Sequence, residues 1–200
     1  MGHVPEKGGI GDDVLAIVRT ARAELPSSHR SLLDQLGVQE TAIEMWPKDV
    51  QALYSTIGEV PPRSSDLTRA VAVWLDRLRV VAFNAPLLAE ATQGLTRAAR
   101  VAAITAVAWH EYGHALSLAR STRDQRRDGV RLLGLLPEGL AQSIDYPGGY
   151  RPGAVFDEVI ATVYAALIRR VRREGYGCPD YLHDDVIQAF KEVIPWPPSR

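Results

Sequence analysis

The sequence predicts a mainly helical α+β fold with a small antiparallel sheet. The first reason is a long Ala-rich stretch, Thr96 to Ala119, because Ala has the highest helix propensity of all residues. The second is that apolar residues recur at helical spacing in several shorter segments. The third is the run Arg79 to Phe83, whose β-branched and aromatic residues are typical of a strand. With 46% hydrophobic residues among 200, the chain can bury one sizeable core.

The elements of the N-terminal part follow from apolar spacing and from helix breakers. Residues 1–11 are Gly-rich and polar, and we expect a flexible tail there. A helix is expected over Asp12–Leu25, because its apolar residues share one broad face. Pro26 ends this helix, and the serines after it can cap a short second helix that closes at Gly37. The next expected elements are a strand over Thr41–Trp46 and a helix over Pro47–Ile57.

The clearest linker in the chain is Pro61-Pro62-Arg63-Ser64-Ser65. After it we expect a helix over Asp66–Leu78 and then the strand, which Asn84-Ala85-Pro86 ends. A further long helix is expected to start near Ala154. We therefore expect a single domain over residues 12–200, with a helical N-terminal part over 12–60 and a core over 66–175.

Composition excludes several classes of protein. A net charge of −1 gives no argument for nucleic acid or an anionic membrane as a partner. The N-terminus has no apolar core of a signal peptide, and no run approaches 18 uninterrupted apolar residues. A single cysteine, Cys178, excludes an intramolecular disulfide. We expect a soluble, cytoplasmic protein without a nucleic-acid or membrane partner.

The motif His110-Glu111-Tyr112-Gly113-His114 lies near the C-terminal end of the long Ala-rich helix. Residues four apart on a helix lie one turn above each other on the same face. His110 and His114 can therefore present two imidazoles to one metal ion, while Glu111 can act as general base towards its water. Gly113 is informative too, because a Gly inside a helix costs about 1 kcal/mol relative to Ala. It predicts that another backbone segment or a substrate comes close there, although ordinary close helix packing would explain it equally well.

A catalytic zinc site needs a third protein ligand and an open position for water. Glu138 is one candidate, because Pro137 suits the first turn of a new helix and Glu138 would then lie at its N-terminal end. Glu158, on the next helix, is the second candidate. Cys178 is a poorer one, since it stands in a turn-like Gly-Cys-Pro sequence.

The H-E-x-x-H motif followed by Glu138-Gly139-Leu140-Ala141 resembles the gluzincin metallopeptidases. The resemblance covers roughly Ala98 to Ala141. It implies a zincin-like core in which His110, His114 and Glu138 bind Zn²⁺ and Glu111 activates water to hydrolyse a peptide or protein substrate. In size the chain is closer to compact zincins that cleave repressors, in which a later E-x-x-A helix supplies the glutamate, the pattern at Glu158. Glu138 ranks above Glu158, because the sequence around Glu138 matches more positions of its motif. The metzincin continuation is excluded, because it needs Gly and His where Ser117 and Arg120 stand.

Other residues are candidates for supporting roles. The strand Leu78–Phe83 is a candidate edge strand to which a peptide substrate could add. A phenol from one of three tyrosines, Tyr146, Tyr150 or Tyr164, could stabilise an oxyanion, although such tyrosines are usually packing residues. Asp145 or Asp157 could orient a zinc-bound histidine. The alternative function is a zincin-like domain that binds metal or another protein without turnover.

Overall fold

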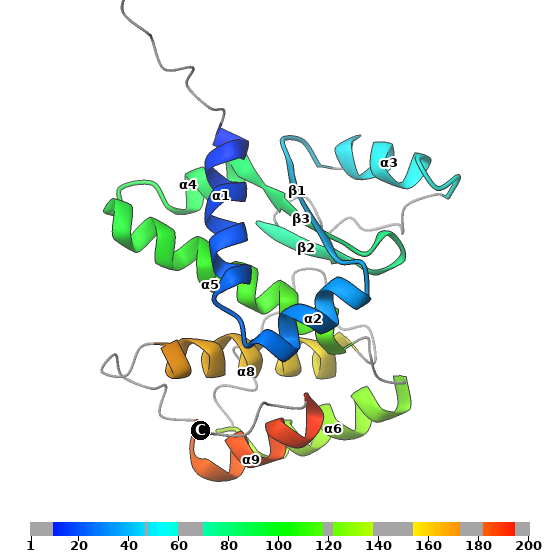
Figure 1. The fold of residues 1–200 in the computed structure, drawn as a ribbon, viewed down its shortest axis with the longest axis vertical. Helices are drawn as coiled ribbons and strands as arrows, with labels where there is room; N and C mark the ends of the chain where they lie inside the picture. The colour runs from blue at the N-terminus through cyan, green and yellow to red at the C-terminus, as the bar shows by residue number, and fades with distance from the viewer. Residues whose placement is uncertain are drawn as a thin grey trace, which may run out of the picture.

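The computed structural model describes residues 10–46, 48–59, 70–117, 122–137, 154–172 and 182–194. It is mainly helical with one small sheet (Figure 1), so the predicted α+β, mainly α fold class is confirmed. The described helices and strands, in chain order, are α1 (Ile10–Ala23), α2 (Ser27–Gln35), β1 (Gln39–Ile43), α3 (Lys48–Ser55), β2 (Ala72–Leu75), β3 (Val80–Asn84), α4 (Ala85–Ala91), α5 (Arg97–Ser117), α6 (Thr122–Leu135), α8 (Ala154–Arg172) and α9 (Asp184–Val193).

The sheet has the strand order β1-β3-β2. β2 and β3 pair in the antiparallel sense, but β1 and β3 pair in the parallel sense. The sheet is therefore mixed, which corrects the expectation of an antiparallel sheet. The long connection through α3 and β2 makes a parallel pair possible, because parallel neighbours need a crossover of a dozen or more residues.

The prediction of an edge strand at Leu78–Phe83 was wrong. β3, which covers most of that segment, is the central strand and has a partner on each side. Its residues alternate between two apolar clusters: Val81 and Phe83 enter one, and Ala82 enters the other. A strand that is buried on both faces reads as one continuous apolar run, and such a strand belongs inside a sheet.

The helix predicted over Asp66–Leu78 was also wrong where the structure describes it. Residues 72–75 form β2, and Asp76–Leu78 form a 3-10 turn that leads into β3. Arg79 closes this hairpin at a φ of 54°, a left-handed conformation that is uncommon for a residue other than glycine. Val73 and Trp74 are residues that favour a pleated, half-buried surface, and pairing with β3 supplies that surface.

Most of the other expected elements are confirmed, with shifted ends. α1 begins at Ile10, and α2 closes before Gly37, which has a φ of 70°. β1 begins at Gln39 rather than Thr41. The long Ala-rich helix is α5, and the helix expected near Ala154 is α8. The linker at residues 61–65 and the tail at residues 1–9 lie outside the described residues.

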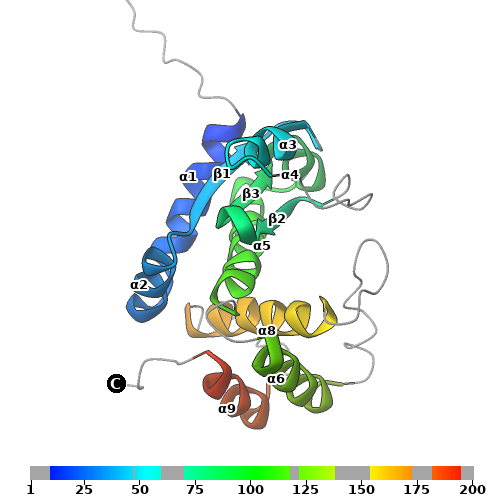
Figure 2. The same ribbon diagram turned by 90° about the vertical axis from the view of Figure 1, so that its right-hand side faces the viewer.

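α5 lies between the sheet with its neighbouring helices and the C-terminal helices. Figures 1 and 2 show α1, α4 and the sheet around its N-terminal part, and α8 crossing it near its C-terminal end, with α6 and α9 beyond. A large apolar cluster fills the space between these elements, and a smaller one lies between the sheet and α3. From Glu111 to Ser117, every residue of α5 is buried, so packing fixes the second half of the motif. None of the helices in the segments described is long and apolar enough to span a membrane.

Candidate metal centre

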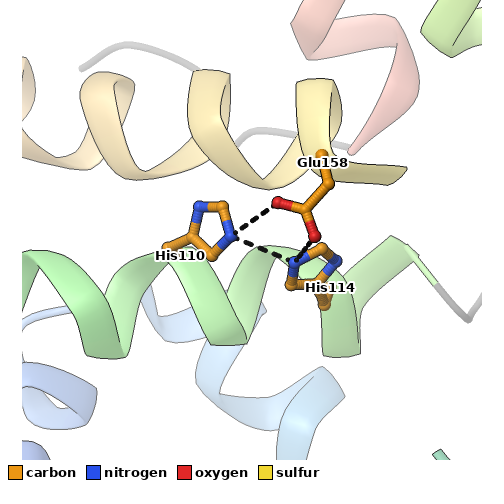
Figure 3. Close-up of side chains that lie close together, drawn as sticks. All are labelled: His110, His114 and Glu158. Carbon is orange, nitrogen blue, oxygen red and sulfur yellow. Dashed lines mark hydrogen bonds and ion pairs between the residues drawn. The ribbon is translucent and has the colours of Figure 1, made fainter. Parts of the chain in front are cut away.

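The two histidines of the motif point their Nε2 atoms to the same place. Both come from the last turns of α5, where His114 is 7% exposed and His110 is half-buried. Their Nε2 atoms lie 3.1 Å apart, and the rings meet edge to face (Figure 3). The helical i, i+4 spacing alone brings them together, as the sequence predicts.

Glu158 reaches this place from α8. Its carboxylate projects between the two imidazoles (Figure 3), with Oε2 3.2 Å from Nε2 of His110 and Oε1 3.3 Å from Nε2 of His114. His110, His114 and Glu158 form a group whose ligand atoms all lie close enough to share one metal ion. Glu158 comes more than forty residues after both histidines in the sequence, so only the packing of α8 on α5 creates the group.

Gly113 explains how α8 comes so close. A Cβ atom at this position would lie 2.7 Å from the Cα of Ala161 and 3.1 Å from the Cβ of Tyr164. Contacts below 3.0 Å between such atoms are not tolerated, so only glycine allows the two helix backbones to approach this far. A close approach at Gly113 is confirmed, and it is close packing of two helices: α8, which carries Glu158, lies against α5 here.

The spacing of the three groups fits a metal ion. Bonds of about 2.0–2.2 Å at tetrahedral angles put neighbouring ligand atoms about 3.3–3.6 Å apart. The distances of 3.1, 3.2 and 3.3 Å among the nitrogen and oxygen atoms are close to this spacing. Two imidazoles and one carboxylate are also a donor set that zinc accepts in proteins.

A second carboxylate holds His114 from behind. Nδ1 of His114 donates a hydrogen bond to Oδ2 of Asp157 at 2.8 Å. A proton on Nδ1 leaves the lone pair on Nε2, which is the atom that faces Glu158 and His110. Of the two aspartates predicted for this role, Asp157 makes the contact, and Asp145 lies outside the described residues.

The charges in this cluster favour a cation. Burial acts to raise the pKa of Glu158, but hydrogen bonds from His110 and His114 outweigh it and hold that pKa well below its usual range. Burial acts to lower the pKa of His114, but the charge and hydrogen bond of Asp157 raise it well above the usual value. A site that attracts a proton onto an imidazole also attracts a metal cation, which would displace that proton from Nε2.

Glu111 is the acidic residue of the motif that stands apart from the three. It is 7% exposed, so most of its side chain is enclosed by the protein. Burial raises its pKa, and the nearby His114 and His110 partly offset this effect. An ionisable carboxylate with a raised pKa beside three candidate metal ligands has the properties of a general base.

Several predicted site residues are not placed. Glu138, the first candidate for the third ligand, lies outside the described residues, as do Tyr146, Tyr150 and Cys178. That ranking therefore stays a prediction, while the second candidate, Glu158, lies beside both histidines. Tyr164 is fully buried, contacts His29 at 3.1 Å and packs against Phe190, so it has a packing role.

Sequence reasoning missed two features around the motif. Tyr112, on the opposite side of α5, donates to Glu40 of β1, which also pairs with Arg22 of α1. This buried network fixes α5 against α1 and the sheet. Ser117 contacts Asp157 beside the metal group. Its position one turn after His114 was the available signal, because residues three apart on a helix are neighbours.

Comparisons with protein-family models, with curated proteins and with solved structures found no match to this chain.

Proposed function

We propose that this protein is a zinc-dependent metallopeptidase in which His110, His114 and Glu158 bind the metal ion and Glu111 is the general base. The observation that carries this proposal is the convergence of two imidazole nitrogens and a carboxylate from a second helix, 3.1 to 3.3 Å apart. We assign the third ligand to Glu158 rather than Glu138, because its carboxylate already lies between the imidazoles.

Zinc is the metal that this donor set favours. Two histidines and one carboxylate are the protein ligands of a well-known class of catalytic zinc sites, in which a fourth position is kept for water or substrate. A bound zinc ion supplies Lewis-acid polarisation of the scissile carbonyl and lowers the pKa of a water molecule.

Side chains of the protein carry out proton transfer and the orientation of the ligands. Glu111 takes a proton from the attacking water as the oxygen bonds to the carbonyl carbon, and passes it to the leaving amine as the C–N bond breaks. Its raised pKa suits a group that must hold this proton between the two steps. Asp157 keeps His114 in the tautomer whose Nε2 is a ligand.

A protein that only holds a metal, or binds a partner through this region, is the second candidate function. Glu111 favours the peptidase. Burial raises the pKa of the Glu111 carboxyl, so a charged carboxylate is costly at this position, and a purely structural metal site would have no use for it. A cost of this kind is typical of functional residues.

Metal content of the purified protein tests the site. We expect about one zinc per chain by mass spectrometry, and loss of it in His110→Ala, His114→Ala and Glu158→Ala. Glu138→Ala is the matched control and should keep the metal. Full zinc content in both histidine variants would refute the site, and loss of zinc only in Glu138→Ala would return the third ligand to the first candidate.

Turnover is tested with Glu111→Gln. This variant should keep the zinc and lose about 10²- to 10⁴-fold in the rate of peptide hydrolysis, the usual contribution of a general base. A mixed peptide library or casein is the starting substrate. Undiminished hydrolysis by the zinc-loaded variant would rule out this role of Glu111, and no hydrolysis by the zinc-loaded wild type would favour the metal-binding alternative.

A further inference from the structure

The last residue of α5 carries a hydroxyl that contacts the group behind His114. Ser117 is fully buried, and its Oγ lies 2.6 Å from Oδ1 of Asp157 and 2.8 Å from the main-chain oxygen of His114. Asp157 uses its other oxygen, Oδ2, to accept the Nδ1 hydrogen of His114 at 2.8 Å. The three residues form a chain of hydrogen bonds that ends on an imidazole of the candidate metal centre.

The hydroxyl of Ser117 can donate its one hydrogen to only one of these two oxygens at a time. The oxygen of Asp157 is the closer one and carries charge, and a hydrogen bond to a carboxylate is about twice as strong as one to a neutral group. Ser117 therefore donates to Asp157. This bond engages Oδ1 and leaves Oδ2 for His114.

Asp157 needs this second bond to keep its orientation. Its side chain is 37% exposed, so water competes with these partners for the carboxylate. Ser117, in contrast, is fully enclosed and sits on the same helix as His114. A fixed donor on α5 thus ties the carboxylate of α8 in the position where it meets the imidazole.

We propose that Ser117 is a positioning residue of the metal centre: through Asp157 it fixes the tautomer and the ring orientation of His114. This inference rests on the proposed function, because it takes His114 to be a metal ligand. Partners that orient a metal-bound histidine are typically worth about 10- to 100-fold in metal affinity. Asp157 should contribute within this range, and Ser117 about tenfold, at its lower end.

A double-mutant cycle on zinc affinity tests the proposal. The affinities of wild type, Ser117→Ala, Asp157→Ala and the double variant are measured by competition with a chromophoric chelator. We expect Ser117→Ala to weaken zinc binding about tenfold in the wild type and to have no further effect once Asp157 is removed. The absorption spectrum of the cobalt-substituted protein should change in Ser117→Ala, because the ligand geometry changes. A purely structural role would leave that spectrum unchanged.

Two sets of controls keep the outcome interpretable. Thr105→Ala removes another buried hydroxyl residue of α5, away from the metal group, and should leave affinity and spectrum unchanged. Ser117→Thr and Ser117→Val have the same shape and differ in the hydroxyl alone. The Ser117→Thr variant should bind zinc about tenfold more tightly than the Ser117→Val variant, even if both variants are less stable than wild type.

The outcomes separate this inference from the proposed function. Equal zinc affinities in Ser117→Thr and Ser117→Val, or the same loss from Ser117→Ala with and without Asp157, would overturn the positioning role and leave the zinc site intact. A wild-type protein that binds no zinc would overturn both.

Discussion

Replacing Gly113 by alanine is expected to damage the candidate metal centre by separating α5 from α8. The new Cβ would lie 2.7 Å from the Cα of Ala161 and 3.2 Å from its main-chain oxygen. Carbon atoms pack at about 3.5–4.0 Å, so the two backbones must move apart by about 1 Å along this line. A metal site tolerates changes of only about 0.2 Å in its ligand distances. Glu158 lies on α8, so its carboxylate would move away from the two imidazoles of α5.

The magnitudes predict different effects on stability and on metal binding. Overpacking costs about 1–3 kcal/mol in the free energy of unfolding, and the higher helix propensity of alanine returns about 1 kcal/mol. We therefore expect the metal-free protein to lose up to about 2 kcal/mol. Zinc affinity should fall at least about tenfold, the lower limit for changes that disturb the orientation of a ligand.

Two measurements on the same variant check this reasoning. Urea denaturation of the metal-free protein gives the change in stability, and chelator competition gives the zinc affinity. Gly134→Ala in α6 is the matched control, because a Cβ there has nothing within 4 Å. It should be neutral or up to about 1 kcal/mol more stable, with unchanged zinc affinity. Wild-type zinc affinity in Gly113→Ala would show that this contact does not set the reach of Glu158.

Three further predictions concern the fold around the site. Tyr112→Phe removes the hydroxyl that donates to Glu40 at 3.0 Å but leaves Glu40 paired with Arg22, so urea denaturation should show a loss of about 1–2 kcal/mol with zinc affinity unchanged. Asn84 is the N-cap of α4, and its side chain accepts a hydrogen bond from the main-chain N–H of Leu87 at 3.0 Å. Asn84→Ala should therefore lower the free energy of unfolding by about 1 kcal/mol in urea denaturation, and an unchanged midpoint would contradict this role. Zinc at one hundred times its dissociation constant should stabilise the wild type by about 2.7 kcal/mol and a chelator should reverse this, whereas calorimetry of His114→Ala should detect no such gain.

Much of the helical framework could be predicted from the sequence. Ala-rich composition and apolar spacing are local properties, and they located α1, α5 and the start of α8. The helix expected before β3 failed for a physical reason. The apolar run from Val71 to Leu75 is too short to distinguish the spacing of a helix from that of a strand. Pairing with β3 decides that it forms a strand. The parallel pairing of β1 with β3 is likewise a long-range choice.

The sequence by itself determined two of the three candidate ligands, because a helix places His110 and His114, four residues apart, on one face. The same motif also supplies Glu111. Gly113 predicted a close approach, because glycine inside a helix lowers its stability and alanine would not. Which helix approaches was decided by the tertiary structure alone. Motif matching ranked Glu138 above Glu158, but the position of a carboxylate in space depends on how α8 packs against α5, where contact at Ala161 sets the distance. The spacing of residues along a helix determines which side chains share a face, whereas the packing of segments distant in the sequence determines which residues that face contacts.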